Sequence, residues 1–170
     1  SQDFIAIEDA IAELKAARMI VLVDDEQREN EGDVIIPAEF ATPEVIDFMM
    51  RNACGIVCLA MSGKICDRLH LDVVTGGSSE APSTPFTLQI DARYGITTGT
   101  SAFDRAATVR AVADPDLRSE DIRMPGHVFP LMAQQGGVLK RAGHTEATVD
   151  LARLAGLYPA GVLCEVLHPD

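Results

Sequence analysis

The sequence has no tryptophan, few aromatic side chains and a shortage of positive charge. Among its 170 residues there are 14 Lys and Arg against 26 Asp and Glu, so the formal net charge is -12 at pH 7. This balance argues against a general nucleic-acid-binding protein, because such proteins gain much of their affinity by neutralising phosphates. A small anionic substrate is compatible with it, since a few arginines, a helix N-terminus or a metal ion can make one pocket locally positive.

Long apolar runs and secretion signals are also missing. No stretch reaches the roughly 20 apolar residues that cross a bilayer, and the first four residues lack the basic start and apolar run of a signal peptide. We therefore expect no membrane association and a cytoplasmic location. The length favours a single domain over residues 1–170.

The sequence has four cysteines, and their spacing matches no paired zinc motif. We interpret Cys54, Cys66 and Cys164 as reduced thiols in or beside the core. The role of Cys58, which lies within an apolar segment, stays open at this point.

Apolar periodicity predicts helices and strands that alternate along the chain. The expected helices cover about 6–17, 42–53, 101–112 and 146–156, and the expected strands cover 19–23, 34–36, 56–61, 86–90, 128–133 and 161–167. This alternation favours a layered α/β domain. Because the connection from Asp25 to Asp33 is short, we expect some neighbouring strands to be antiparallel and the sheet to be mixed. Residues 75–85, rich in Gly, Ser and Pro, indicate a mobile loop.

An acidic segment at residues 24–33 separates the first two expected strands. It contains six carboxylates and one arginine. One interpretation is a solvated acidic hairpin. The other is a loop that gathers oxygen ligands for magnesium, which prefers carboxylates and water and would relieve the repulsion between these charges. Composition alone does not decide between the two.

A second polar segment, residues 136–146, leads through two basic residues into a helix. Free backbone N–H groups at the helix start, together with Arg141 and the Thr145 hydroxyl, would suit a phosphate. His144 offers a ring nitrogen to a metal ion. Alternatively, His144 and Thr145 cap the helix and Arg141 is a surface charge. The spacing is compatible with both interpretations.

Two further ionisable residues lie beside apolar strands. His127 follows Pro125-Gly126, where a tight turn would aim the imidazole into a pocket, although a lone histidine is more often structural. Glu165 interrupts an apolar strand, so it is paired, protonated or exposed on a wet face. A buried carboxylate with a raised pKa would be a candidate general acid or base.

Taken in order, these segments resemble the 3,4-dihydroxy-2-butanone 4-phosphate synthase family. The matching runs are residues 24–33, 55–58, 97–101, 123–128, 143–147 and 163–165. The resemblance implies a three-layer α/β/α arrangement with a mixed, twisted sheet. It also implies a homodimeric, magnesium-dependent lyase of riboflavin biosynthesis, in which manganese can substitute. This activity converts D-ribulose 5-phosphate into L-3,4-dihydroxybutan-2-one 4-phosphate and formate, with the active site near the subunit boundary.

The resemblance also implies a role for individual residues. Glu29 and His144 match the family's metal ligands, and Arg28 and Asp33 match its substrate contacts. The phosphate-binding run corresponds to Arg141, Ala142, Gly143, His144 and Thr145.

By the same resemblance, His127 and Glu165 match the positions tied to acid–base catalysis. Glu29 and Glu165 are also implied to bind substrate. Asp24, Cys58, Thr98 and Glu146 also lie in matching segments, without a definite role.

Two departures from the family pattern are visible. The segment 75–85 follows it poorly, and the chain stops at Asp170 where relatives usually continue, so we expect a domain truncated at its C-terminus. Some relatives carry a GTP cyclohydrolase domain downstream. The alternatives are a binding protein that keeps the fold without catalysis and a different metal-dependent sugar-phosphate enzyme, which would release no formate.

Overall fold

The computed structural model describes residues 4–74 and 84–168, so most of the segment expected to be a mobile loop lies outside the described residues. The helices are α1 (Ile7–Lys15), α2 (Pro43–Phe48), α3 (Gly63–Leu69), α4 (Ala102–Val112) and α5 (His144–Leu154). The strands are β1 (Ile20–Val23), β2 (Gly32–Pro37), β3 (Cys58–Met61), β4 (Ile90–Ala92), β5 (Ile122–Met132) and β6 (Ala160–Glu165). Among the described residues, no helix combines the length and apolarity that a membrane crossing requires.

The strands form one mixed sheet in the order β1-β2-β6-β3-β5-β4. Strands β3 and β5 are parallel, and the other neighbours pair antiparallel. The expectation of a mixed sheet is therefore confirmed, and the acidic segment is the hairpin connection between β1 and β2.

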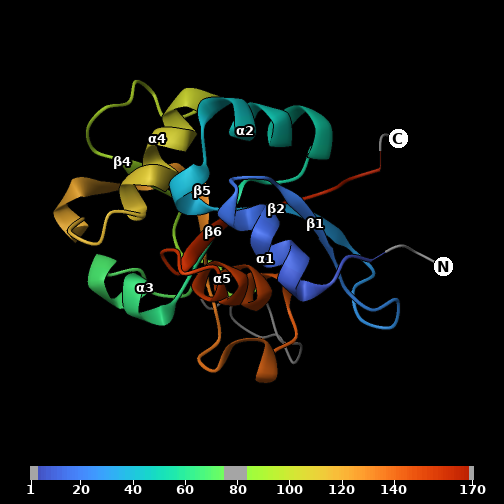
Figure 1. Cartoon of the computed structure of the whole chain (residues 1–170). Helices are drawn as coiled ribbons and strands as arrows, with labels where there is room; N and C mark the ends of the chain where they lie inside the picture. The colour runs from blue at the N-terminus through green and yellow to red at the C-terminus, as the bar shows by residue number, and fades with distance from the viewer. Residues whose placement is uncertain (1–3, 75–83, 169–170) are drawn as a thin grey trace.

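Alternate side chains of the central strands enter two separate cores, one on each face of the sheet. Leu59 of β3 and Val162 of β6 pack with α2 and α4, whereas Cys58 of β3 and Leu163 of β6 pack with α1 and α5. Figure 1 shows α2 and α4 on one side of the sheet and α5 on the other. Because successive side chains of a strand point to opposite faces, this alternation produces the three-layer α/β/α arrangement that was expected.

Local signals place most helix starts correctly. The Thr42 hydroxyl accepts the N–H of Val45 at 3.3 Å, and the Ser101 hydroxyl accepts that of Asp104 at 3.1 Å. Helix α2 continues as a π-helical turn at Met49–Ala53, which completes the expected span.

Two expectations in the second half of the chain need correction. The expected strand 86–90 is reduced to isolated bridges at Phe86 and Thr87, and β4 begins at Ile90. Strand β5 begins at Ile122 instead of residue 128. Pro125 lies within this strand, although a proline usually indicates a break in a strand.

Candidate functional site

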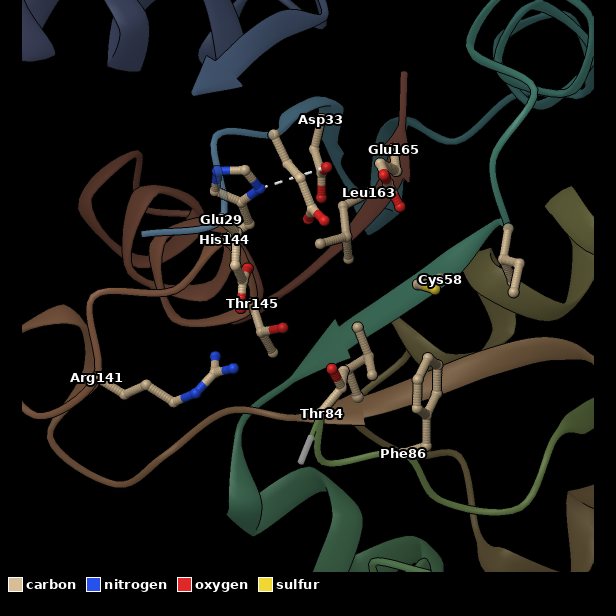
Figure 2. Close-up of a pocket in the computed structure, with 13 residues that line it drawn as sticks. Glu29, Asp33, Cys58, Thr84, Phe86, Arg141, His144, Thr145, Leu163 and Glu165 are labelled. Carbon is tan, nitrogen blue, oxygen red and sulfur yellow. Dashed lines mark ion pairs between the residues drawn. The ribbon is translucent and has the colours of Figure 1, made fainter. Parts of the chain in front are cut away.

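A cavity of about 360 Å³ lies where three strand ends meet the start of α5. Because β6 is antiparallel to both β2 and β3, the end of β6 and the starts of its neighbours reach the same edge of the sheet. Asp33 is the register partner of Glu165. The lining residues, shown in Figure 2, are Glu29, Glu31, Asp33, Ile56, Cys58, Thr84, Phe86, Leu131, Arg141, His144, Thr145, Leu163 and Glu165.

The cavity unites most of the residues that the sequence assigned to the site. Glu29 and Asp33 come from the acidic hairpin, His144 and Thr145 from the start of α5, and Glu165 from the end of β6. Arg141 completes the set, whereas Arg28, Ala142 and Gly143 do not line this cavity.

Asp24 organises the acidic hairpin. Its carboxylate accepts the N–H of Glu31 at 2.9 Å, the N–H of Glu29 at 3.1 Å and a guanidinium N–H of Arg28 at 2.7 Å. Burial alone would raise the pKa of Asp24, but these donors outweigh it and lower the pKa to about 2. The hairpin is therefore an ordered loop held by one ionised carboxylate, and not merely a solvated cluster of charge.

Arg28 is occupied within the same hairpin. Its guanidinium also donates to Glu29 at 2.8 Å, so it holds a cavity-lining carboxylate from outside the cavity. The geometry thus gives Arg28 an indirect contact with the cavity.

Four carboxylates surround the cavity: Glu29, Glu31, Asp33 and Glu165. Burial raises the pKa of Glu31, and the negative charges of Glu165, Glu29 and Asp33 raise it further. Such crowding of like charge would be relieved by a divalent cation.

His144 has the environment of a metal ligand. Its Nδ1 forms an ion-pair contact with Asp33 Oδ1 at 3.3 Å. Among the residues that the structure describes, neither its buried Nε2 nor Asp33 Oδ1 has a hydrogen-bond partner. Burial would lower the pKa of His144, but the contact with Asp33 outweighs it and raises the pKa. A carboxylate that orients one ring nitrogen commonly leaves the other free for a metal ion.

The donor set fits a magnesium site completed by water or substrate. Glu29 and His144 both line the cavity, on the same side in Figure 2. Over residues 4–74 and 84–168, no group of three or more His, Cys, Asp and Glu side chains is arranged to hold a metal ion. Magnesium commonly uses only one or two protein ligands, so this pair is sufficient when a phosphorylated ligand and water complete the shell.

The start of α5 suits an anion. The N-cap is Gly143, and no side chain caps the helix, so the alternative in which His144 and Thr145 act as caps is wrong. Thr145 and Arg141 line the cavity beside the free N–H groups of the first turn.

Cys58 lies in the cavity wall as a neutral thiol. Burial raises its pKa to about 12, and neighbouring negative charge adds to this shift. A thiolate nucleophile at this position is therefore excluded near neutral pH.

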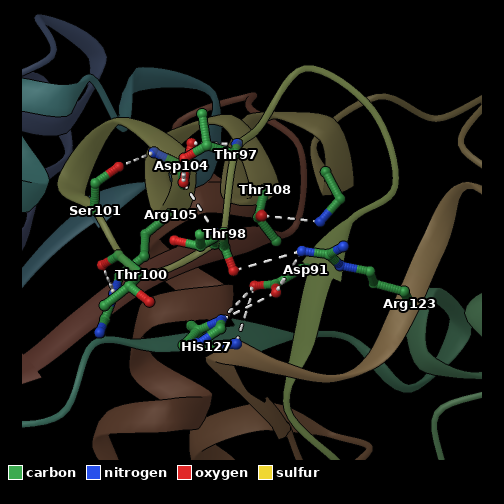
Figure 3. A network of polar contacts seen from close by, with 12 residues as sticks. Asp91, Thr97, Thr98, Thr100, Ser101, Asp104, Arg105, Thr108, Arg123 and His127 are labelled. Atoms are coloured by element: carbon green, nitrogen blue, oxygen red, sulfur yellow. Dashed lines mark hydrogen bonds and ion pairs between the residues drawn. The ribbon is translucent and has the colours of Figure 1, made fainter.

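His127 lies outside the cavity, in the polar network of Figure 3. Its Nδ1 lies 3.0 Å from Asp91 Oδ2, and its backbone N–H donates to Asp91 Oδ1 at 3.0 Å. Asp91 is 1% exposed and also contacts Arg123 at 3.4 Å. Within one chain, the two expected acid–base residues, His127 and Glu165, are therefore not brought to the same cavity.

The turn before α4 closes the space around this histidine. Asp104 accepts backbone N–H groups of Thr97 and Gly99 at 3.0 and 2.9 Å. Gly99 has φ +100°, and a Cβ there would approach Asp91 within 2.3 Å and His127 within 2.6 Å. Glycine is therefore required by both the backbone and the packing.

Sequence reasoning missed Asp91. The available signal is the one that identified Glu165, because Asp91 is also a carboxylate within an apolar strand. Glu31, Thr84 and Phe86 were likewise not assigned individually, and only the folded chain brings them to the cavity.

Comparison with known proteins adds independent evidence. The sequence model of one family, 3,4-dihydroxy-2-butanone 4-phosphate synthase, matches residues 8–170. The chain is 54% identical over 169 residues to the riboflavin biosynthesis protein RibBA of Synechocystis, with 98% of this chain and 30% of the relative covered. It is 50% identical over 164 residues to the 3,4-dihydroxy-2-butanone 4-phosphate synthase of Neisseria meningitidis, with 96% and 45% covered.

Solved structures agree with this likeness. A two-domain 3,4-dihydroxy-2-butanone 4-phosphate synthase from A. baumannii, RibBX, matches with a TM-score of 0.93 and 48% identity, over 98% of this chain and 49% of that one. A 3,4-dihydroxy-2-butanone 4-phosphate synthase in complex with two magnesium ions matches with a TM-score of 0.92 and 43% identity, over 96% of this chain and 76% of that one. The chain spans less than half the length of the curated relatives described above.

Proposed function

The chain belongs to the 3,4-dihydroxy-2-butanone 4-phosphate synthase family, and we propose that it converts D-ribulose 5-phosphate into L-3,4-dihydroxybutan-2-one 4-phosphate and formate in riboflavin biosynthesis. The observation that carries this proposal is that one cavity brings together four carboxylates, a helix start suited to a phosphate, and a His144 Nε2 without a hydrogen-bond partner among the described residues. A metal ion and a phosphorylated ligand would find complementary groups there at the same time.

Substrate positioning is assigned to the start of α5. Within the run 141–145, the phosphate lies against the free N–H groups at the first turn of α5, with Arg141 and Thr145 as side-chain donors. Asp33 and Glu29, which also line the cavity, are assigned to the sugar part of the substrate. Fixing the phosphate at one end keeps the reacting carbons in register with the carboxylates at the other.

The proposed cofactor is magnesium, with manganese as a substitute, held by Glu29 and His144. A magnesium ion bound there would supply a Lewis acid for the negative oxygens of an enediolate. The Asp33 contact at Nδ1 keeps the imidazole oriented for this role. Support comes from the relative whose structure contains two magnesium ions.

Proton transfers are assigned to Glu165 and His127. Formation of an enediolate removes a proton beside the ketone, loss of the C1 hydroxyl requires an acid, and formate release requires further proton movement. Glu165 lines the cavity directly. His127 is oriented by Asp91, which leaves Nε2 as the nitrogen for exchange with substrate.

We place His127 of the partner subunit at the cavity of a homodimer. This assignment follows from its position outside the cavity of its own chain. Exposed apolar side chains on the neighbouring segments, Tyr94, Phe103 and Met124, provide a surface that a second copy would cover.

Formate production tests the reaction. The protein, extended to the full length of its parent chain where that is longer, is incubated with ribulose 5-phosphate and magnesium. Formate in one-to-one ratio with consumed substrate supports the lyase. Consumption without formate would indicate another sugar-phosphate enzyme, and binding without consumption would indicate a binding protein.

Mixed dimers test the shared site. Glu165→Gln and His127→Asn are each expected to inactivate the homodimer. Equal amounts, refolded together, should recover about a quarter of wild-type activity, because half of the dimers then contain one intact site of two. If His127 serves its own chain, the mixture stays inactive.

A further inference from the structure

The carboxylate of Glu146, on the first turn of α5, is completely buried and uses both of its oxygens. Oε1 accepts the backbone N–H of Gln134 at 2.9 Å, and Oε2 accepts a guanidinium N–H of Arg141 at 2.9 Å. A buried charge is tolerated only when such partners compensate for its lost hydration. Glu146 therefore joins the segment after β5 to Arg141 at the cavity.

Arg141 has no competing side-chain attachment among residues 4–74 and 84–168. Its guanidinium donates to Glu146 alone within that part of the chain, and its side chain is 25% exposed, at the cavity wall. Because a guanidinium has five N–H donors, most of them remain available to a ligand.

Gly143 leaves just enough room for this pair. A Cβ at Gly143 would lie 2.1 Å from Arg141 Nη1 and 2.6 Å from Glu146 Oε2. The ion pair consequently packs directly against the backbone that precedes the helix, and its position is fixed relative to the free N–H groups of α5.

Without Glu146, Arg141 could pair with other carboxylates of the cavity instead of with the substrate phosphate. Four other carboxylates line the cavity, and a guanidinium without a fixed partner would be attracted to them. We propose that Glu146 is a positioning residue that holds Arg141 away from these acids, so that its remaining donors face the phosphate of the substrate. This inference rests on the proposed function and adds a determinant of phosphate affinity to it.

Asp150 provides a matched control on the same helix. It lies one turn further along α5 and accepts the backbone N–H of Val138 at 2.9 Å, so it also holds the segment that leads to the helix. Its other contact is with Arg153, at 3.4 Å, and not with Arg141. Asp150→Asn therefore removes a carboxylate with a similar pair of contacts, 23% exposed where Glu146 is fully buried, without touching the proposed phosphate site.

The experiment compares Glu146→Gln with Asp150→Asn in steady-state kinetics and in competition by inorganic phosphate. In Glu146→Gln, the KM for ribulose 5-phosphate and the inhibition constant of phosphate should both rise about tenfold, with kcat changed less than about threefold, as for one lost charge-assisted contact. Asp150→Asn should leave both constants near wild type. In an Arg141→Gln background, Glu146→Gln should add little, because it acts through Arg141.

The controls separate this inference from the reaction itself. A wild-type protein that releases no formate contradicts the proposed function. The positioning role is contradicted if the wild type is active and Glu146→Gln leaves KM unchanged, lowers KM or reduces only kcat. An additive effect of Glu146→Gln in the Arg141→Gln background contradicts it as well.

If Glu146→Gln does not fold, the wild-type protein still answers the question. A guanidinium held by Glu146 should show slow rotation about the Cζ–Nη bond in nitrogen-15 spectra of the arginine side chains. Titration with inorganic phosphate should shift that signal, identified from its loss in Arg141→Gln. A freely rotating Arg141, or one that phosphate does not shift, overturns the proposal.

Discussion

The histidine–aspartate pairs His144–Asp33 and His127–Asp91 lie in different surroundings. His144 meets Asp33 at 3.3 Å in the cavity, and His127 meets Asp91 at 3.0 Å in the network outside it. Both contacts use Nδ1. Nε2 of His144 is buried in a cavity with four carboxylates and has no hydrogen-bond partner among the described residues, whereas the His127 side chain is 39% exposed. The histidine of such a pair therefore suits metal binding inside the cavity and proton transfer outside it, because the surroundings differ.

The largest effect should follow from removing the imidazole in the cavity. His144→Asn should reduce formate production by at least about 1000-fold, because the Lewis acid loses a ligand. Manganese binding, measured by electron paramagnetic resonance, should weaken in parallel. The control is His70→Asn, an exposed position with φ 56°, a conformation that asparagine tolerates. Unchanged manganese binding in His144→Asn would remove His144 from the metal site.

Loss of the Asp91 carboxylate, which lies outside the cavity, should affect catalysis and leave metal binding unchanged. Asp91→Asn should lower kcat about 100-fold, because the amide no longer fixes the tautomer and orientation of His127. Manganese affinity should remain that of the wild type. A fall in metal affinity would mean that the two histidine pairs are not functionally distinct.

Loss of the Asp33 carboxylate, which lies in the cavity, should first weaken metal binding. Asp33→Asn should weaken manganese binding about tenfold, the range for a group that orients a metal-ligating histidine. Part of the activity should return at high metal concentration. If saturating metal restores nothing while affinity is normal, Asp33 acts on the substrate instead of through His144.

The smallest effect concerns the loops that hold each pair in place. Asp24 holds the hairpin by backbone N–H groups, and Asp104 does the same for the turn at Thr97 and Gly99. The pKa of Asp24 is lowered from its ordinary 3.8 to about 2, so its stabilisation is complete above about pH 4 and is lost as the pH falls towards 2. Hydrogen bonds from Thr97 also lower the pKa of Asp104.

Amide signals of Glu29 and Glu31, both donors to Asp24, should report this loss between about pH 4 and 2. In Asp24→Asn the transition should disappear. A transition centred near pH 4 in the wild-type protein would show that these donors do not stabilise the ionised form.

Much of the fold was predictable from local patterns. The helix starts capped by Thr42 and Ser101, most of the short apolar strands and the acidic connection after β1 depend on a few residues each, and they are found where they were expected. The segment around Phe86 was mispredicted because its apolar residues contribute isolated bridges instead of a strand. Strand β5 was predicted too short because its pairing with β4 overrides the local effect of Pro125.

The residue types of the candidate site were also predictable from local motifs, but only the family resemblance linked Glu29 with His144. Glu29 and His144 are far apart along the chain and lie at one cavity because antiparallel pairing brings the start of β2 to the end of β6, next to α5. The same strand pairing does not bring His127 to that cavity. Nothing in the local sequence distinguishes these cases.

The sequence by itself determined the class of fold, the family and the types of chemical group available, because these depend on periodicity, capping and short motifs. The tertiary structure decided which groups meet, how the two histidine pairs differ and why Glu146 is tied to Arg141. Those outcomes depend on strand order, register and burial, which arise from contacts between segments that are distant in sequence.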